Sequence, residues 1–181
     1  KFIKNIKKKD MTREKMNYDL LIVGAGPSGL AAAIKFKKMC IENSKDYTVC
    51  VVEKGSEVGA HILSGAILQP TAMDELFNDW RDNSDCPVKV EVKKESVKFM
   101  TSNKSFNIPN FLIPPVMHNK GNFIISLGSL CKWLGNEAEK LGVEIYPGFA
   151  ASDIIIENGV LKGIVTGDLG VDSEGNPGQN Y

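Results

Sequence analysis

A glycine-rich turn between an apolar run and a small-residue helix constrains this chain more than any other feature. Residues 20–23 (Leu-Leu-Ile-Val) form a short apolar run, typical of a strand buried on both faces of a parallel sheet. Gly24, Gly26 and Gly29 follow in G-x-G-x-x-G spacing, and residues 30–34 open a helix. Such glycines permit a tight turn, let the backbone approach a pyrophosphate, and let the helix pack closely on the strand. The stretch predicts a dinucleotide-binding βαβ unit, with a purely structural turn as the alternative.

The ribose of a dinucleotide needs an acidic acceptor at the end of the next parallel strand. Residues 49–52 (Val-Cys-Val-Val) have the character of that strand, and Glu53 stands at its end. The spacing from Gly29 is somewhat longer than the usual distance of about 20 residues, and the polar loop 41–47 can absorb the difference. Because Glu53 is acidic and no arginine stands beside it, a 2′-phosphate and hence NADP are disfavoured.

The charge pattern separates a basic tail from a balanced domain. Lys and Arg together number 22, as do Asp and Glu, so no overall field favours nucleic acid as a partner. Residues 1–17 are strongly basic, however, and suggest a targeting-peptide remnant, a solvated arm or a membrane-surface contact. No run approaches the ~18 apolar residues of a transmembrane helix. Residues 18–181 then form the predicted domain, and we expect it to be incomplete at the C-terminal end.

Two segments after the first βαβ unit are unusual. Residues 54–68 form a second glycine-punctuated loop, more than NAD requires, which favours a ligand with a second bulky ring near Ser64 and Gly65. Residues 79–123 form an expected insertion, with a half-exposed strand over 88–92. Within it, residues 108–117 are apolar yet carry three prolines, which exclude a long helix or central strand. Such a loop is either buried or meets lipid or a partner.

The remaining residues predict a return to the parallel sheet and then a β-meander. After a strand at 123–127, Ser129 is positioned to cap an amphipathic helix that Gly142 ends. A strand follows at 143–146, and Asn158-Gly159 between apolar runs predicts a hairpin. The fold class is therefore α/β: a Rossmann-like fold with a parallel sheet, a β-meander and an inserted mixed α+β segment.

The cysteines do not suggest a metal centre. They are scattered, with no C-x-x-C spacing, and Cys50 and Cys131 fall inside an expected strand and helix. We interpret these two as core thiols and predict no metal site in this chain.

Several stretches resemble the electron-transfer flavoprotein–ubiquinone oxidoreductases. They are residues 23–30 (Val-Gly-Ala-Gly-Pro-Ser-Gly-Leu), 52–54 (Val-Glu-Lys), 59–66 (Gly-Ala-His-Ile-Leu-Ser-Gly-Ala), 118–123 (His-Asn-Lys-Gly-Asn-Phe) and 137–151, the last ending in Tyr-Pro-Gly-Phe-Ala-Ala. The first is shared by many flavoproteins, whereas 59–66 and the end of 137–151 are more particular. In one departure from the wider flavoprotein group, Ser126 stands where an arginine often precedes the helix.

The resemblance implies FAD as the cofactor, bound by residues at matching positions. Gly24, Gly26, Pro27, Ser28 and Gly29 would hold the pyrophosphate, and Glu53 the adenosine ribose, with Lys54 beside it. The loop containing Ala60, His61, Ser64 and Gly65 would lie against the isoalloxazine, and Ala150 and Ala151 near the adenine. His61 would tune the ring or serve as a structural histidine. No catalytic residue is expected, because the flavin carries the redox chemistry.

The resemblance also implies a peripheral enzyme of the mitochondrial inner membrane, or of a bacterial membrane. Electrons would pass from reduced electron-transfer flavoprotein to ubiquinone through FAD and a 4Fe-4S cluster whose ligands lie beyond Tyr181. The loop over 106–117 would dip into the membrane near the quinone entrance, through Ile108, Phe111, Leu112, Ile113, Val116 and Met117. The alternatives are another membrane-associated FAD oxidoreductase, of the prenyl-lipid reductase or aromatic hydroxylase type, and a non-catalytic dinucleotide-binding fragment.

Overall fold

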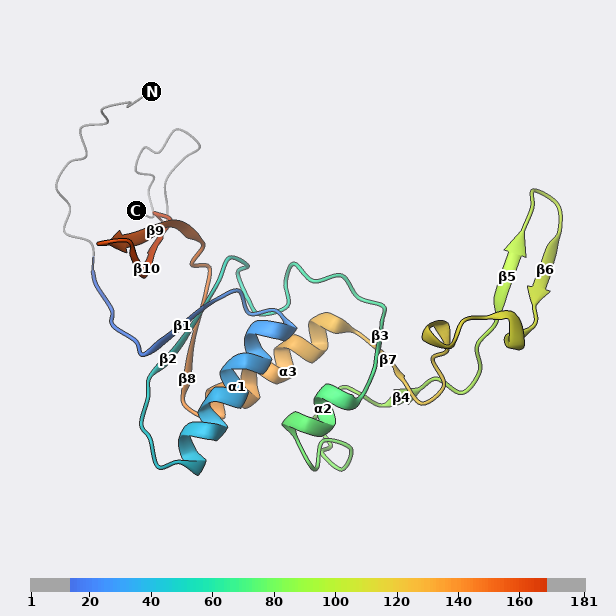
Figure 1. Cartoon of the computed structure of the whole chain (residues 1–181), viewed down its shortest axis with the longest axis horizontal. Helices are drawn as coiled ribbons and strands as arrows, with labels where there is room; N and C mark the ends of the chain where they lie inside the picture. Colours follow the sequence, from blue (N-terminus) through green and yellow to red (C-terminus); the bar gives the residue numbers. More distant parts are fainter. Residues whose placement is uncertain (1–13, 169–181) are drawn as a thin grey trace, which may run out of the picture.

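A three-stranded parallel sheet forms the centre of the computed structural model, which describes residues 14–168. Its strands are β1 (Leu20–Val23), β2 (Val49–Glu53) and β8 (Val143–Pro147), in the order β1-β2-β8, and all of them are parallel. Helix α1 (Pro27–Glu42) connects β1 to β2, so the expected βαβ unit is confirmed (Figure 1).

The central position of β2 explains which apolar residues are buried. Val49, Cys50, Val51 and Val52 are all buried, since β2 has a neighbour on each side. Strand β1 lies at the edge of the described sheet and is only partly buried, with Val23 59% exposed. The expectation of a β1 buried on both faces is therefore wrong for the described residues.

Helix α3 (Leu127–Lys140) packs beside α1 and leads into β8. Its N-cap is Ser126, whose side chain accepts a hydrogen bond from the Ser129 N–H, so the expected cap at Ser129 is one turn too late. Gly142 follows the last turn with φ +82°, in agreement with its predicted role as the helix stop.

A second, smaller sheet lies beyond the helices and interrupts the parallel one in sequence. Strands β3 (Ala66–Leu68), β7 (Phe123–Ile125) and β4 (Val90–Glu91) pair antiparallel in the order β3-β7-β4, and α2 (Thr71–Leu76) follows β3. The expected five-residue strand at 88–92 is thus reduced to two residues. Val88 and Val92 are buried, whereas Val90 between them is exposed. In a regular strand these three alternate residues would lie on the same face.

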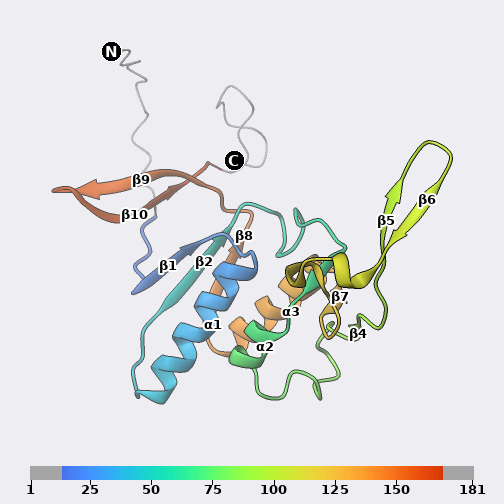
Figure 2. The same cartoon turned by 45° about the vertical axis from the view of Figure 1, so that its right-hand side comes forward.

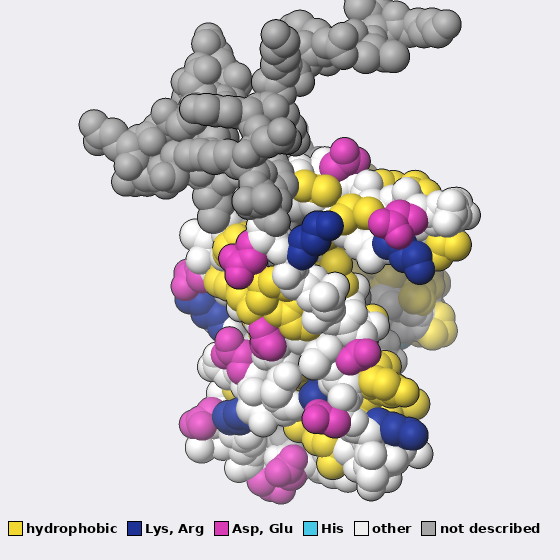
Figure 3. Space-filling model, turned by 90° about the vertical axis from the view of Figure 1, so that its left-hand side faces the viewer, with side chains coloured by type: hydrophobic (Ala, Val, Ile, Leu, Met, Phe, Trp, Pro, Cys, Tyr) yellow, Lys and Arg dark blue, Asp and Glu magenta, His cyan; other side chains and the backbone are white. Residues whose placement is uncertain are grey.

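Two hairpins project from opposite ends of the molecule (Figures 1 and 2). One is formed by β5 (Val97–Met100) and β6 (Ser105–Ile108), and the sequence analysis above missed it. The other is formed by β9 (Ala151–Glu157) and β10 (Val160–Thr166) around the predicted Asn158-Gly159 turn, in which both residues have positive φ. Viewed from the β9–β10 side, the surface carries hydrophobic side chains among charged ones (Figure 3).

The cysteines all lie in the interior. Cys40, Cys50, Cys86 and Cys131 are buried free thiols. Burial raises the pKa of both Cys50 and Cys131 to about 11, which keeps these thiols protonated and unreactive at neutral pH. The interpretation of Cys50 and Cys131 as core thiols is confirmed.

Candidate dinucleotide-binding site

The carboxyl ends of the parallel strands bring the predicted site residues to one edge of the sheet. Val23 of β1 is in register with Val52 of β2, and Glu53 of β2 with Pro147 of β8. The Gly24 N–H donates a 2.7 Å hydrogen bond to the Val52 carbonyl, which fixes the glycine turn next to the end of β2. Ligands of open parallel sheets bind at this edge.

The three glycines of the turn have different surroundings, which separate their roles. Gly24 has φ +102°, a conformation that favours glycine. A Cβ atom at Gly29 would lie 2.1 Å from the Gly24 carbonyl oxygen, so only glycine lets α1 approach the turn this closely. A Cβ atom at Gly26 would meet nothing within 4 Å. The space where a Gly26 side chain would lie is therefore open to a ligand, whereas the corresponding space at Gly29 is occupied by the Gly24 carbonyl group.

The first turn of α1 offers free hydrogen-bond donors. Gly26 is the N-cap, no side chain caps the helix, and no acidic residue lies in the first turn. Pro27 has no N–H, and the Leu30 N–H donates to the Gly26 carbonyl. The N–H groups of Ser28 and Gly29 have no intrahelical partner at this position of a helix. Together with the helix dipole, they form an anion site suited to a pyrophosphate.

The carboxylate of Glu53 faces the glycine turn. Its Oε2 accepts a 2.8 Å hydrogen bond from the Ala25 N–H, and its Oε1 accepts a 2.7 Å bond from the Gly55 N–H. An ionised carboxylate offers about four acceptor positions, so two remain for the hydroxyls of a ribose. The backbone bonds hold the group in a single orientation before any ligand arrives.

Gly55 lies between Glu53 and two other parts of the chain, namely His61 and the segment that connects β8 to β9. A Cβ atom at Gly55 would lie 3.2 Å from Glu53 Oε1 and 3.4 Å from His61 Nδ1. The Gly148 N–H donates to the Gly55 carbonyl at 2.7 Å, which brings the segment before Ala150 and Ala151 to the same place. The segment that leads to the expected adenine-side residues therefore lies next to Gly55, whose N–H bonds to the expected ribose acceptor.

The other predicted contact residues lie on the outer part of the second loop. Lys54, Ala60, Ser64 and Gly65 are all exposed, and no hydrogen bond joins them to the glycine turn among the described residues. Leu63 is 89% exposed between them. The loop itself is fixed at Gly59, where a Cβ atom would lie 2.7 Å from the Gly128 carbonyl oxygen of α3.

The apolar proline-rich segment is exposed, so the alternative of a buried loop is wrong. It forms two short 3-10 helices, η1 (Asn110–Leu112) and η2 (Pro115–Met117), and Phe111 is 85% and Val116 90% exposed. Leu112 and Met117 are also exposed, as are Phe99, Met100 and Phe106 on the adjoining hairpin. Ile108 is half-buried. Ile113 is only 7% exposed and turns inward, so its predicted place on a membrane-facing side is corrected.

The Glu95 carboxylate, which the sequence analysis missed, fixes the end of this segment. Glu95 Oε1 lies 2.9 Å from His118 Nδ1, and Oε2 accepts a 2.7 Å bond from the Asn119 N–H. Hydrogen bonds from His118 and from the Asn119 backbone lower the pKa of Glu95. The two residues are distant in sequence, and no spacing rule connects them.

We expect this anchor to weaken in acid. The pKa of Glu95 is lower in the folded chain than in the unfolded one, so the carboxylate stabilises the turn at neutral pH. This stabilisation begins to decrease when the pH falls below the pKa of an unfolded glutamate, about 4.3. It is lost once the pH has passed below the lowered pKa of Glu95 in the folded chain. Glu95→Gln should speed amide hydrogen exchange at Asn119 at pH 7, whereas Glu91→Gln should not. Equal exchange in wild type and Glu95→Gln would show that the carboxylate does not anchor the turn.

A second cluster missed by the sequence analysis spans the parallel sheet. The Tyr18 and Tyr146 hydroxyls both donate to Glu144 Oε2, at 2.7 and 2.6 Å. These bonds lower the pKa of Glu144 and connect the start of β1 to β8 across β2.

Residues 14–168 contain no group of three or more His, Cys, Asp or Glu side chains arranged to hold a metal ion. Within the same range, every helix falls short of the length and apolar character needed to cross a bilayer.

The fold and the glycine-turn site define a Rossmann-like α/β protein of the dinucleotide-binding type. A family model described as "NAD(P)-binding Rossmann-like domain" matches residues 22–78. A geranylgeranyl bacteriochlorophyll reductase-like protein from Thermoplasma acidophilum is similar in structure, with a TM-score of 0.58 at 22% identity over 82% of this chain and 34% of that one. A myxobacterial chondrochloren halogenase, described as a variant of FAD-dependent halogenases, gives 0.54 at 17% identity over 88% and 34%.

The chain is homologous over nearly its whole length to proteins named electron transfer flavoprotein-ubiquinone oxidoreductase. The Pseudomonas aeruginosa protein is 56% identical over 94% of this chain and 31% of its own length. The mitochondrial protein of Dictyostelium discoideum is 48% identical over 93% of this chain and 27% of its own length. The chain therefore spans about 30% of the length of these curated relatives.

Proposed function

We propose that the chain is the FAD-binding part of an enzyme that passes electrons from reduced electron-transfer flavoprotein to ubiquinone. The observation that carries this proposal is the geometry at the end of β2. There the Glu53 carboxylate is fixed by the Ala25 and Gly55 N–H groups, beside a glycine turn whose helix start has free donors. The names of the homologues support the reaction and its two partners.

The residues at the sheet edge fit FAD. The open side of Gly26 and the N–H groups of Ser28 and Gly29 suit its pyrophosphate, and Glu53 suits the adenosine ribose. The adenine would lie near Ala150 and Ala151, and the isoalloxazine against Ala60, His61, Ser64 and Gly65. Lys54 would lie beside the ribose. When bound, the flavin supplies the one- and two-electron redox chemistry, while the chain binds and orients it. A 4Fe-4S cluster would be held by residues outside this chain.

The exposed apolar segment supports a peripheral membrane location, in the mitochondrial inner membrane or a bacterial membrane. Phe111, Leu112, Val116 and Met117 are exposed on η1 and η2. These two short 3-10 helices lie next to the β5–β6 hairpin (Figure 1). Large exposed apolar side chains gathered at one place mark contact with lipid or a partner. We propose that they contact the bilayer on the side from which ubiquinone enters. Residues 79–123 would then be the insertion that carries this contact.

The reaction is tested on the full-length protein with reduced electron-transfer flavoprotein and ubiquinone. We expect oxidation of the flavoprotein at a rate that depends on the quinone concentration. A protein that retains flavin but does not oxidise electron-transfer flavoprotein would contradict this reaction in favour of another FAD oxidoreductase. A protein that retains no flavin, judged by its visible absorption spectrum, would favour a module without redox activity.

Glu53→Ala should weaken FAD binding by about 10- to 150-fold. The ribose hydroxyls would lose a charged acceptor, and hydrogen bonds to charged groups contribute about 1.5–3 kcal/mol. Glu57→Ala is a suitable control, because Glu57 is also acidic and nearby in sequence, but is exposed and pairs with Lys132 at 3.0 Å. Titration with FAD, followed by flavin fluorescence, measures both variants. Unchanged affinity in Glu53→Ala would refute the ribose assignment.

A further inference from the structure

The projecting segment 92–120 is strongly basic, although the chain as a whole has a net charge of zero. It contains one acidic residue, Glu95, and five lysines, namely Lys93, Lys94, Lys98, Lys104 and Lys120. All five lysines are exposed. The same segment carries the exposed apolar side chains of η1, η2 and the β5–β6 hairpin. Positive charge and apolar surface therefore occur together on one projection.

The acidic residue does not neutralise these lysines through direct pairing. Both oxygens of Glu95 are engaged, one by His118 Nδ1 and the other by the Asn119 N–H. No ion pair joins any of the five lysines to an acidic side chain within the part of the chain that the structure describes. Their charges remain available to a partner.

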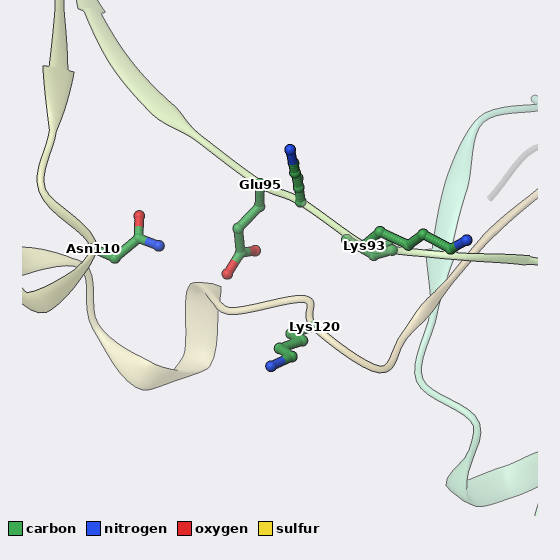
Figure 4. A pocket seen from close by; sticks show the side chains of 6 residues that line it. Lys93, Glu95, Asn110 and Lys120 are labelled. Atoms are coloured by element: carbon green, nitrogen blue, oxygen red, sulfur yellow. The ribbon is translucent and has the colours of Figure 1, made fainter.

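A hollow of about 270 Å³ lies where the lysines meet the apolar turns. Its lining consists of Val92, Lys93, Lys94, Glu95, Asn110 and Lys120. Figure 4 shows Asn110 and Lys120 on either side of Glu95, while the Lys93 side chain extends away from Glu95. Asn110 directly precedes the exposed Phe111 and Leu112. A group seated here would lie at the base of the apolar turns.

We propose that Lys93, Lys94 and Lys120 bind the phosphates of anionic phospholipid head groups, so that segment 92–120 prefers an anionic bilayer surface. This proposal rests on the proposed membrane contact and adds the lipid class. Apolar side chains that enter the acyl boundary would bring these lysines to the depth of the head groups. Lysine near an anionic surface adds binding energy, and one apolar anchor alone binds weakly. Charge complementarity thus favours an anionic lipid.

Vesicle co-sedimentation of the full chain loaded with FAD tests the proposal. One set of vesicles is phosphatidylcholine alone, and the other contains phosphatidylglycerol as well. The test variant is Lys93→Gln/Lys94→Gln/Lys120→Gln. The matched control is Lys35→Gln/Lys45→Gln/Lys162→Gln, which removes the same charge at exposed lysines elsewhere. Thermal unfolding of each variant establishes that the fold is retained.

We expect wild type and the control to bind the phosphatidylglycerol vesicles more tightly than neutral vesicles. The test variant should lose on the order of 100-fold in affinity for the anionic vesicles, at about fivefold per lysine. The preference should also decline at high salt, because charges at a surface are screened.

Four outcomes would overturn the proposal in different ways. Equal binding of wild type to both kinds of vesicle would leave the proposed membrane contact intact and refute the lipid preference. Equal losses in the test and control variants would show a general charge effect rather than contacts by these lysines. Inorganic phosphate that protects the hollow from lysine modification, without any anionic preference in the vesicle assay, would identify a free-phosphate site instead. Absence of binding to either kind of vesicle would refute the membrane contact itself.

Discussion

Replacing Gly29 by alanine is expected to destabilise the chain by about 3 kcal/mol or more and to abolish FAD binding. The new Cβ atom would lie 2.1 Å from the Gly24 carbonyl oxygen and 3.2 Å from Ile22 Cγ2. The first of these is a backbone atom that a rotamer change cannot remove, so α1 must move away from β1. Overpacking costs about 1–3 kcal/mol and occasionally more, and a conflict with a backbone atom this close belongs at the upper end of that range.

The measurement is chemical denaturation of Gly29→Ala, together with FAD titration. Gly55→Ala serves as a comparison with a smaller steric conflict, since its Cβ atom would lie 3.2 Å from its nearest neighbours. If Gly29→Ala unfolded at the wild-type denaturant concentration, the close packing of helix and turn described above would be incorrect.

Replacing both Phe111 and Leu112 by aspartate is expected to abolish binding to lipid vesicles. Burial of a large apolar side chain contributes about 1.5–3 kcal/mol, so loss of two corresponds to a fall of about 10²- to 10⁴-fold before any cost of the new charges. Both side chains are mostly exposed, so the fold should be unaffected.

A matched control is Ile154→Asp/Ile156→Asp on the opposite hairpin, where both side chains are 57% exposed. Co-sedimentation with vesicles should separate the two double variants clearly. Persistent binding by Phe111→Asp/Leu112→Asp would refute insertion of this segment, and loss of binding in the control would place the contact on β9–β10 instead.

The parts of the fold that could be predicted from the sequence depend on local signals. The glycine spacing at 24–29, the apolar run of β2 and the Asn158-Gly159 turn each act over a few residues, and all of them formed as expected. The orientation of Glu53 toward the turn also follows, because parallel strands end at the same edge. The burial of β1 did not follow, because it depends on which segments, distant in sequence, cover the two faces of the sheet.

The remaining features of the fold and the site depend on contacts between residues distant in sequence, or on a choice between two nearby residues that suit the same role. The contact of Glu95 with His118 spans 23 positions, and the bonds from Tyr18 to Glu144 and Tyr146 span 126 and 128, with no sequence pattern to indicate them. The β5–β6 hairpin was detectable, since polar residues 101–104 separate two runs that contain aromatic and β-branched residues. The N-cap of α3 is Ser126 and not the expected Ser129, because two serines three positions apart compete for this role.

Affinity for FAD in wild type and Gly26→Ala tests the central claim most directly. Gly26 has φ −78°, which alanine tolerates, and its Cβ atom would meet no protein atom within 4 Å. The fold should therefore lose at most about 1 kcal/mol from the altered N-cap. The methyl group would instead occupy the space assigned to the pyrophosphate. We expect wild type to bind FAD and Gly26→Ala to bind it at least tenfold more weakly. Equal affinities, with both proteins folded, would contradict a pyrophosphate site at Gly26.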